Sequence, residues 1–160
     1  MSRSGPGDRG AAFKPVVLKP LDGLPAGACP CGLGGGYEEC CGRFHRGAAN
    51  APTAELLMRS RFAAFAVQDE AYLLRTWHPE TRPPAVAFDP FQRWTRLEIL
   101  ETTGGSQFHT EGTVRFRAHY RERGRAGVQE EDSRFGRDGE GRWVYLDGVQ
   151  ASAKLRRTGR

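Results

Sequence analysis

The chain has 160 residues and a net charge of +5, a length that suits one main domain with a short appended module. Apolar residues make up 38% and charged residues 27% of it, as in an average globular protein, and 21 glycines indicate some irregular segments. No apolar run approaches the roughly 20 residues of a membrane span, and the polar N-terminus does not resemble a signal peptide, so we expect a cytoplasmic protein without membrane contact.

The first two segments differ sharply in composition. Residues 1–28 are predicted to form a flexible N-terminal arm, because they hold many prolines and glycines and have neither helical nor strand periodicity. Residues 29–47 hold every cysteine of the chain and have no hydrophobic run long enough for a core. Something other than apolar burial must order this second segment.

The cysteines follow the pattern Cys29-x-Cys31, eight residues, then Cys40-Cys41. Disulfides need an oxidising compartment and suitable geometry, and a redox dithiol typically has the spacing Cys-x-x-Cys. Two tight turns that each present a pair of thiolates instead suit tetrahedral Zn²⁺. We therefore expect one structural zinc ion, whose binding free energy, on the order of 10 kcal/mol, orders the segment. His45 is the alternative to one of the adjacent cysteines as fourth ligand.

Two helices are expected next. Apolar residues recur at helical spacing over residues 53–67, and Thr53 is a suitable N-cap. Asp69 is the N-cap of a second, shorter helix, in which Leu73 and Trp77 lie one turn apart until Pro79 ends the pattern.

The remaining periodic segments alternate with a period of two, which predicts half-buried strands. They lie at residues 97–99, 114–120, 129–135 and 143–146. Turn signals separate them at Gly104-Gly105, Arg123-Gly124 and Asp138-Gly139. Helices followed by an antiparallel meander predict an α+β domain over residues 52–150, in which the two helices cover one face of the sheet.

The basic residues are mostly arginines scattered along the chain, and they cluster in the C-terminal tail, residues 151–160. Such a tail is typically solvated, although it can contact phosphates. Nucleic acid or the ribosome is therefore a secondary partner hypothesis.

The run from Cys29 to Gly42 resembles the SEC-C motif, the zinc knuckle named for the C-terminal end of the SecA translocation ATPase. The resemblance implies that the four cysteines are the ligands and that the knuckle docks a protein or ribosomal partner, as SecA-type knuckles do. The chain departs from the motif at Leu33, where Ser is usual, and at Gly35-Gly36, where basic residues are common. None of these positions is a ligand.

Residues 51–61, 72–79, 132–135 and 143–148 resemble segments of the YchJ-like family of bacterial proteins. This resemblance implies a middle domain with the nuclear transport factor 2-like (cystatin-like) fold, in which a curved antiparallel sheet wraps around helices to form a cone. Domains of this fold have a pocket inside the cone and serve as enzymes, binding modules or dimers, so a homodimer is a further expectation.

Seven residues are candidates to line such a pocket: Trp77, His78, Tyr120, Asp132, Arg134, Trp143 and Tyr145. His78 and Asp132 are the candidate acid/base pair. The structural alternatives are a helix C-cap for His78, a cross-strand charge pair of Asp132 with Arg134, and core positions for the tryptophans.

The run Met58-Arg59-Ser60-Arg61 presents either two arginines for an anionic ligand or partner, or a solvated helix face. Ser60 has no His or Asp at a recognisable nucleophile spacing. We expect a zinc-binding adaptor whose knuckle docks a protein partner. The alternative is an enzyme acting on a small molecule in the cone pocket, with His78 and Asp132 as the reactive pair.

Overall fold

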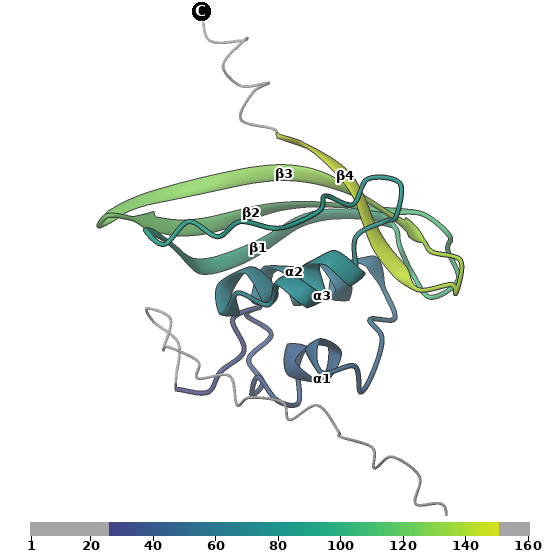
Figure 1. Cartoon of the computed structure of the whole chain (residues 1–160), viewed down its shortest axis with the longest axis horizontal. Coiled ribbons are helices and arrows are strands. Elements are labelled where there is room, and N and C mark those ends of the chain that lie inside the picture. The colour runs from purple at the N-terminus through teal and green to yellow at the C-terminus, as the bar shows by residue number, and fades with distance from the viewer. Residues whose placement is uncertain (1–25, 151–160) are drawn as a thin grey trace, which may run out of the picture.

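The computed structural model describes residues 26–150, which form three layers (Figure 1). A cysteine-rich knuckle that ends in helix α1 (Cys41–His45) lies beneath helices α2 (Ala54–Val67) and α3 (Glu70–Arg75). A curved sheet lies above these two helices, and its strands follow the chain in order: β1 (Gln92–Gly104), β2 (Gly112–Glu122), β3 (Arg125–Arg137) and β4 (Trp143–Gln150).

Both predicted N-caps are present. The hydroxyl of Thr53 accepts a hydrogen bond from the amide of Leu56 at 3.2 Å, and the carboxylate of Asp69 accepts one from the amide of Tyr72 at 3.0 Å. Between the helices, Gln68 adopts a left-handed conformation that ends α2 and lets α3 begin at once.

The second helix ends earlier than predicted. It stops at Arg75, and the residues after it add a short parallel bridge to the edge of the sheet, pairing Trp77 with Tyr145 of β4. The amide of Tyr145 donates to the carbonyl of Thr76 at 2.8 Å, and the amide of His78 donates to the carbonyl of Tyr145 at 2.7 Å. The expectation of a helical turn from Leu73 to Trp77 is therefore wrong, because β4 offers these backbone groups better partners.

The sheet is an antiparallel meander in the order β1-β2-β3-β4, which confirms the predicted α+β class. Its strands are longer than the sequence pattern indicated, because charged residues continue the ladders beyond the apolar positions. Register shifts leave one extra residue in β1 after Trp94 and another after Ile99, and one in β4 at Leu146. Irregularities of this kind bend strands, and the sheet curves over the helices.

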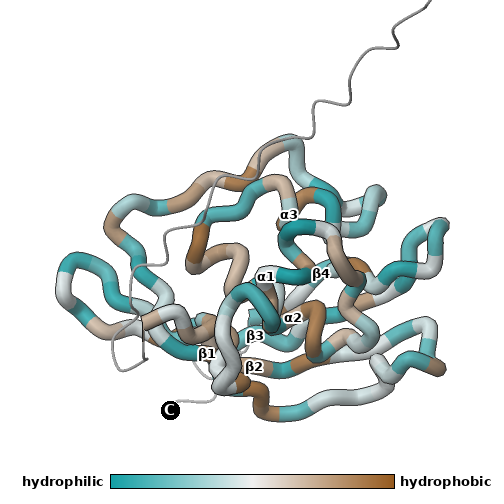
Figure 2. The backbone as a smooth tube through the Cα atoms, turned by 90° about the horizontal axis from the view of Figure 1, so that it is seen from below, coloured by the Kyte–Doolittle hydropathy of each residue, from teal (hydrophilic) through white to brown (hydrophobic). Residues whose placement is uncertain are grey.

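The core lies between the concave face of the sheet and α2. Val114, Phe116 and Phe135 of the sheet are buried against Leu57 and Phe62 of the helix. Figure 2, seen from below, shows the helices lying across the sheet with hydrophobic stretches in them. The convex face carries ion pairs instead, such as Arg117 with Glu130, so the core lies on one face of the sheet and charged pairs on the other, as the period of two predicts.

The predicted arm and tail lie largely outside the described residues. Residues 26–28 of that arm belong to the knuckle, because the carbonyl of Gly27 accepts a hydrogen bond from the amide of Tyr37 at 2.9 Å and Ala28 pairs with Gly36. No helix within residues 26–150 combines the length and the apolar character that a membrane crossing requires.

Candidate metal centre and cone cavity

The four cysteine sulfurs converge on one point. All four lie within 4.8 Å of one another, and Sγ of Cys31 is 3.5 Å from Sγ of Cys40. Cys29, Cys31 and Cys41 are buried, and Cys40 is partly buried. Because Zn–S bonds of about 2.3 Å in a tetrahedron place sulfurs about 3.8 Å apart, the cluster matches a tetrahedral ion with little rearrangement. The donor set is that of a soft, thiolate-preferring metal.

Tight turns bring the first cysteine pair into place. The amide of Cys29 donates to the carbonyl of Gly35 at 2.9 Å, and Gly32 and Gly34 have φ values of +85° and +91°. Only glycine adopts these values without strain. The second pair begins a helix, since Cys40 is the N-cap of α1 and Cys41 its first residue.

Three of the cysteine thiols shift one another's pKa. Hydrogen bonds from Cys31 and Cys41 hold the pKa of the Cys29 thiol far below its usual value. Hydrogen bonds with Cys29 and Cys31, together with burial, raise the pKa of Cys41. A divalent cation removes this competition by binding all four sulfurs as thiolates, so metal binding must release protons.

His45 is not a ligand in this arrangement. Its Nδ1 lies 2.5 Å from the hydroxyl of Tyr37, and its Nε2 lies 2.8 Å from the carbonyl oxygen of Ser60. That carbonyl can only accept, so Nε2 carries the proton and Nδ1 accepts from Tyr37. Burial lowers the pKa of His45, which favours this neutral form. Both ring nitrogens are occupied, and the structure thereby favours the four-cysteine alternative.

The knuckle is joined to the helices by hydrogen bonds from two arginines. Nη1 of Arg59 in α2 donates to the carbonyl of Cys31 at 2.9 Å. Nη2 of Arg75 in α3 donates to the carbonyls of Phe44 and His45 at 3.0 and 2.7 Å. The cysteine cluster therefore packs on the helical layer as part of one structure.

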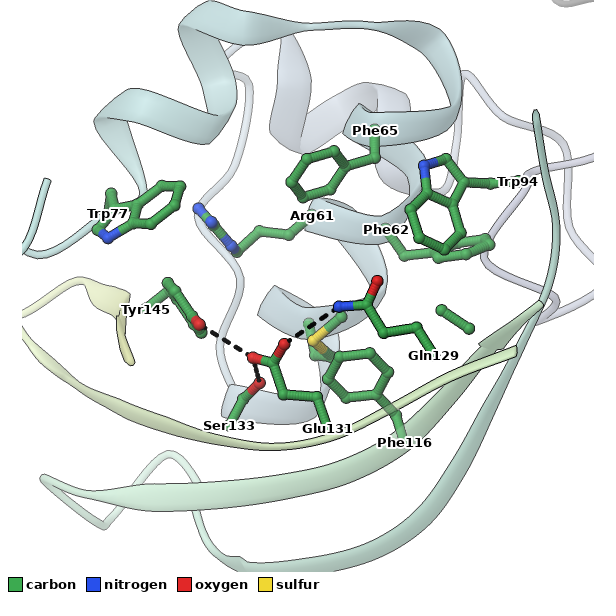
Figure 3. A pocket seen from close by; sticks show the side chains of 12 residues that line it. Arg61, Phe62, Phe65, Trp77, Trp94, Phe116, Gln129, Glu131, Ser133 and Tyr145 are labelled. Carbon is green, nitrogen blue, oxygen red and sulfur yellow. Dashed lines mark hydrogen bonds between the residues drawn. The ribbon is translucent and has the colours of Figure 1, made fainter. Parts of the chain in front are cut away.

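A second candidate site lies on the other side of α2. A cavity of about 250 Å³ opens between this helix and the concave face of the sheet (Figure 3). Its walls are mainly aromatic: Phe62, Phe65, Trp77, Trp94, Phe116 and Tyr145. Its polar lining consists of Arg61, Gln129, Glu131 and Ser133. The fold thus provides an aromatic pocket with both a cation and an anion in its walls.

Comparison with known proteins identifies the family. The model of the YchJ middle NTF2-like domain matches residues 53–148. The chain belongs to the YchJ family. A UPF0225 protein of Streptomyces avermitilis is 66% identical over 121 residues, which are 76% of this chain and 83% of that protein. One from Streptomyces coelicolor is 59% identical over 125 residues, covering 78% and 97%.

Two solved structures have the same fold. A SEC-C motif containing protein from Rhodopseudomonas palustris is 32% identical, with a TM-score of 0.65 over 76% of this chain and 96% of that one. Another SEC-C motif containing protein, from Psychrobacter arcticus, has a TM-score of 0.62 at 23% identity, covering 74% and 80%. Members of the YchJ family and these neighbours therefore share the cone, and the first neighbour supports the SEC-C resemblance.

In this YchJ family member the predicted acid/base pair does not line the cavity. Asp132 is exposed and lies on the opposite face of β3 from Glu131 and Ser133, because successive strand residues alternate in direction. His78 lies after the helix end, and its Nδ1 accepts a hydrogen bond from the amide of Glu80 at 3.1 Å. The pairing of His78 with Asp132 in a pocket is wrong, and so is the C-cap alternative for His78.

Of the other predicted lining residues, some line the cavity and others do not. Trp77 and Tyr145 line the cavity, and their rings meet edge to face at 5.2 Å. Tyr120 instead packs against Trp94. Trp143 is buried in the core and donates to the carbonyl of Pro52 at 3.1 Å.

The predicted charge pair is wrong as well. Arg134 forms a two-pronged ion pair with Asp147 of β4, at 2.6 and 2.7 Å, and not with Asp132. Arg134 and Asp147 are both exposed, so this pair lies outside the cavity.

Sequence reasoning missed the polar groups of the cavity. Arg61 was expected on the helix surface, yet it is 3% exposed. Gln129, Glu131 and Ser133 follow one another at a spacing of two on the inner face of β3, where apolar residues are the rule. This run of inward-facing polar residues is the feature of the sequence that could have indicated a polar cavity wall.

Proposed function

We propose that this YchJ family protein is a zinc-binding adaptor, in which one structural Zn²⁺ shapes the knuckle and the knuckle docks a protein partner. The convergence of four sulfurs within 4.8 Å supports zinc, because an all-thiolate tetrahedral set is typical of structural zinc sites. Four protein ligands leave no open position for a reacting water, which supports a structural ion.

The docking role is supported by the loop between the two cysteine pairs. Residues 32–36 are exposed, and Leu33 retains 50% of its surface at this loop. Glu38 and Glu39 are exposed beside it, and four thiolates around one Zn²⁺ add a net charge of −2. Arg46 pairs with Glu38 at 3.4 Å, so Glu39 and the thiolates supply the unpaired negative charge beside Leu33. An exposed apolar side chain next to this charge favours a protein partner with an apolar pocket and a basic rim over nucleic acid.

The test compares capture of proteins from a bacterial lysate by the zinc-loaded wild type, Leu33→Asp and Val128→Asp. Val128 is a matched control, since it is also 50% exposed but lies in β3. The adaptor role predicts a partner that Leu33→Asp loses and Val128→Asp keeps, and whose binding to the purified chain weakens with salt. Equal capture by all three proteins would refute docking through this loop.

A second role, binding of a small molecule in the cone, is supported by the aromatic cavity. Glu131 is the one carboxylate in its lining, and no His or Cys contributes to it. Three neutral donors hold Glu131: the side chains of Gln129, Ser133 and Tyr145. These contacts favour a binding site over a site for acid/base chemistry.

A further inference from the structure

Arg61 is the most unusual group in the cavity, because its charge is almost fully withdrawn from solvent. Its Nη1 donates to the carbonyl of Leu73 and to the hydroxyl of Thr76, both at 2.8 Å. The rings of Trp77 and Tyr145 lie 4.9 and 4.8 Å from its guanidinium carbon. These contacts hold the guanidinium in one orientation, which is visible in Figure 3.

Part of this guanidinium is free to meet a ligand. Both of its hydrogen bonds are made by Nη1, so its Nε and Nη2 have no hydrogen-bond partner among residues 26–150. Within the same residues, Nε1 of Trp77 is the one side-chain nitrogen or oxygen that is fully enclosed and has no partner. The unpartnered nitrogens of Arg61 are therefore not fully enclosed, and they open to the cavity that Arg61 lines.

Glu131 lies near enough to attract this charge, but within residues 26–150 it forms no ion pair or hydrogen bond with Arg61, because its carboxylate is held by other side chains. Its Oε1 accepts from the hydroxyls of Ser133 at 2.8 Å and Tyr145 at 2.9 Å, and its Oε2 has a longer bond of 3.4 Å from Gln129. Figure 3 shows Arg61 and Glu131 entering the cavity from opposite layers, helix and sheet. A ligand can therefore meet a cation from one side and an acceptor, Oε2, from the other.

The cavity walls favour a ligand with a flat, apolar ring. Phe62 and Trp94 pack edge to face at 6.0 Å, and Phe65 lies 6.3 Å from Trp94. A volume of about 250 Å³ is below the roughly 300–1,000 Å³ of pockets for drug-sized ligands, so it suits one ring or two fused rings. Aromatic faces favour stacking or edge contacts with such rings.

We propose that the cavity binds a small aromatic monocarboxylate that carries a hydrogen-bond donor on its ring. The carboxylate meets Nε and Nη2 of Arg61 in the two-pronged geometry typical of guanidinium groups. The ring lies among Phe62, Phe65 and Trp94, and its donor faces Oε2 of Glu131. This inference rests on the proposed small-molecule role of the cone and names the ligand class for it.

The experiment uses the full chain with its metal bound. Isothermal titration at neutral pH compares 4-hydroxybenzoate and indole-3-carboxylate with their neutral amides, which have nearly the same shape. Because a charge-assisted two-pronged bond is lost, the amides should bind at least about tenfold more weakly. This comparison is made on the unmodified protein, so it does not depend on whether a variant folds.

Two substitutions then place the binding in the cavity. Arg61→Gln should remove the preference for acid over amide, and Arg61→Lys should keep part of it, since lysine retains the charge without the planar fork. Circular dichroism and zinc content verify the fold of each variant. Equal binding of acids and amides to the wild type would overturn the ligand class and leave small-molecule binding standing. No binding of either series at millimolar concentration would overturn both, and a preference that survives Arg61→Gln would overturn the role of Arg61.

Discussion

Arg59 and Arg61 lie two residues apart on α2 and serve opposite sides of it. Nη1 of Arg59 donates to the carbonyl of Cys31 in the metal-site loop at 2.9 Å, whereas Nη1 of Arg61 donates to the carbonyl of Leu73 beside the cavity at 2.8 Å. Both sequence interpretations of this run, a shared basic face and a solvated face, are therefore wrong. The helix is covered on both sides, so it physically connects the knuckle to the cone.

Metal removal is the first test. We expect one zinc ion per chain by elemental analysis of the purified protein, and loss of that ion in Cys31→Ser. Chelation of the wild type should lower the melting temperature and unfold the knuckle, because metal binding in such peptides is worth roughly 10–16 kcal/mol at neutral pH. Acid should release the ion as well, since protons compete for thiolates. A wild-type protein free of metal, with an unchanged melting curve in chelator, would refute the zinc site.

Replacing His45 tests whether this residue is a metal ligand or a structural group. His45→Phe should keep one zinc per chain, because the four sulfurs remain. It should cost about 2–4 kcal/mol of unfolding free energy in urea, since the hydroxyl of Tyr37 and the carbonyl of Ser60 each lose a buried partner. Zinc loss in the folded variant would instead identify His45 as a ligand.

Arg59 should control how long the metal stays bound. In Arg59→Ala the loop at Cys31 loses its hydrogen bond to α2, and a bond of about 1 kcal/mol corresponds to roughly fivefold faster zinc release to a chromogenic chelator. Arg46→Ala is the control, because Arg46 bonds to Glu38 within the knuckle and is exposed. Equal release rates in the two variants would contradict a role for α2 in holding the loop.

Gly148 should be needed to keep Glu131 in place. A Cβ atom at Gly148 would lie 1.9 Å from Oε1 and 2.8 Å from Cγ of Glu131, so Gly148→Ala must displace this carboxylate. We expect a loss of about 1–3 kcal/mol of unfolding free energy and a weaker affinity for aromatic ligands with a ring donor. Gly139→Ala is the matched control, because nothing lies within 4 Å of a Cβ there, and it should match the wild type in both measurements.

Local patterns predicted the starts of α2 and α3 and the alternation of the strands, and they missed contacts between distant segments. Helix caps at Thr53 and Asp69 depend on atoms three residues away, so the sequence displays them directly. The end of α3 at Arg75 depends on β4, about seventy residues further on, and no local rule describes a backbone partner that distant. The same limit explains why the pairing of Arg134 with Asp147 was missed.

The sequence by itself determined the candidate metal-binding cysteines, the helix starts and the alternation of the strands, because spacing and local hydrogen bonds decide these features. Only the tertiary structure decided that His45 bonds to Ser60, fifteen residues away, and that Arg59 reaches Cys31 across 28 residues. It also decided that Arg61 enters the cavity opposite Glu131. The partner of a polar side chain depends on which groups lie near it in space. On a helix that is covered on both sides, the residue type alone does not show which side an arginine contacts.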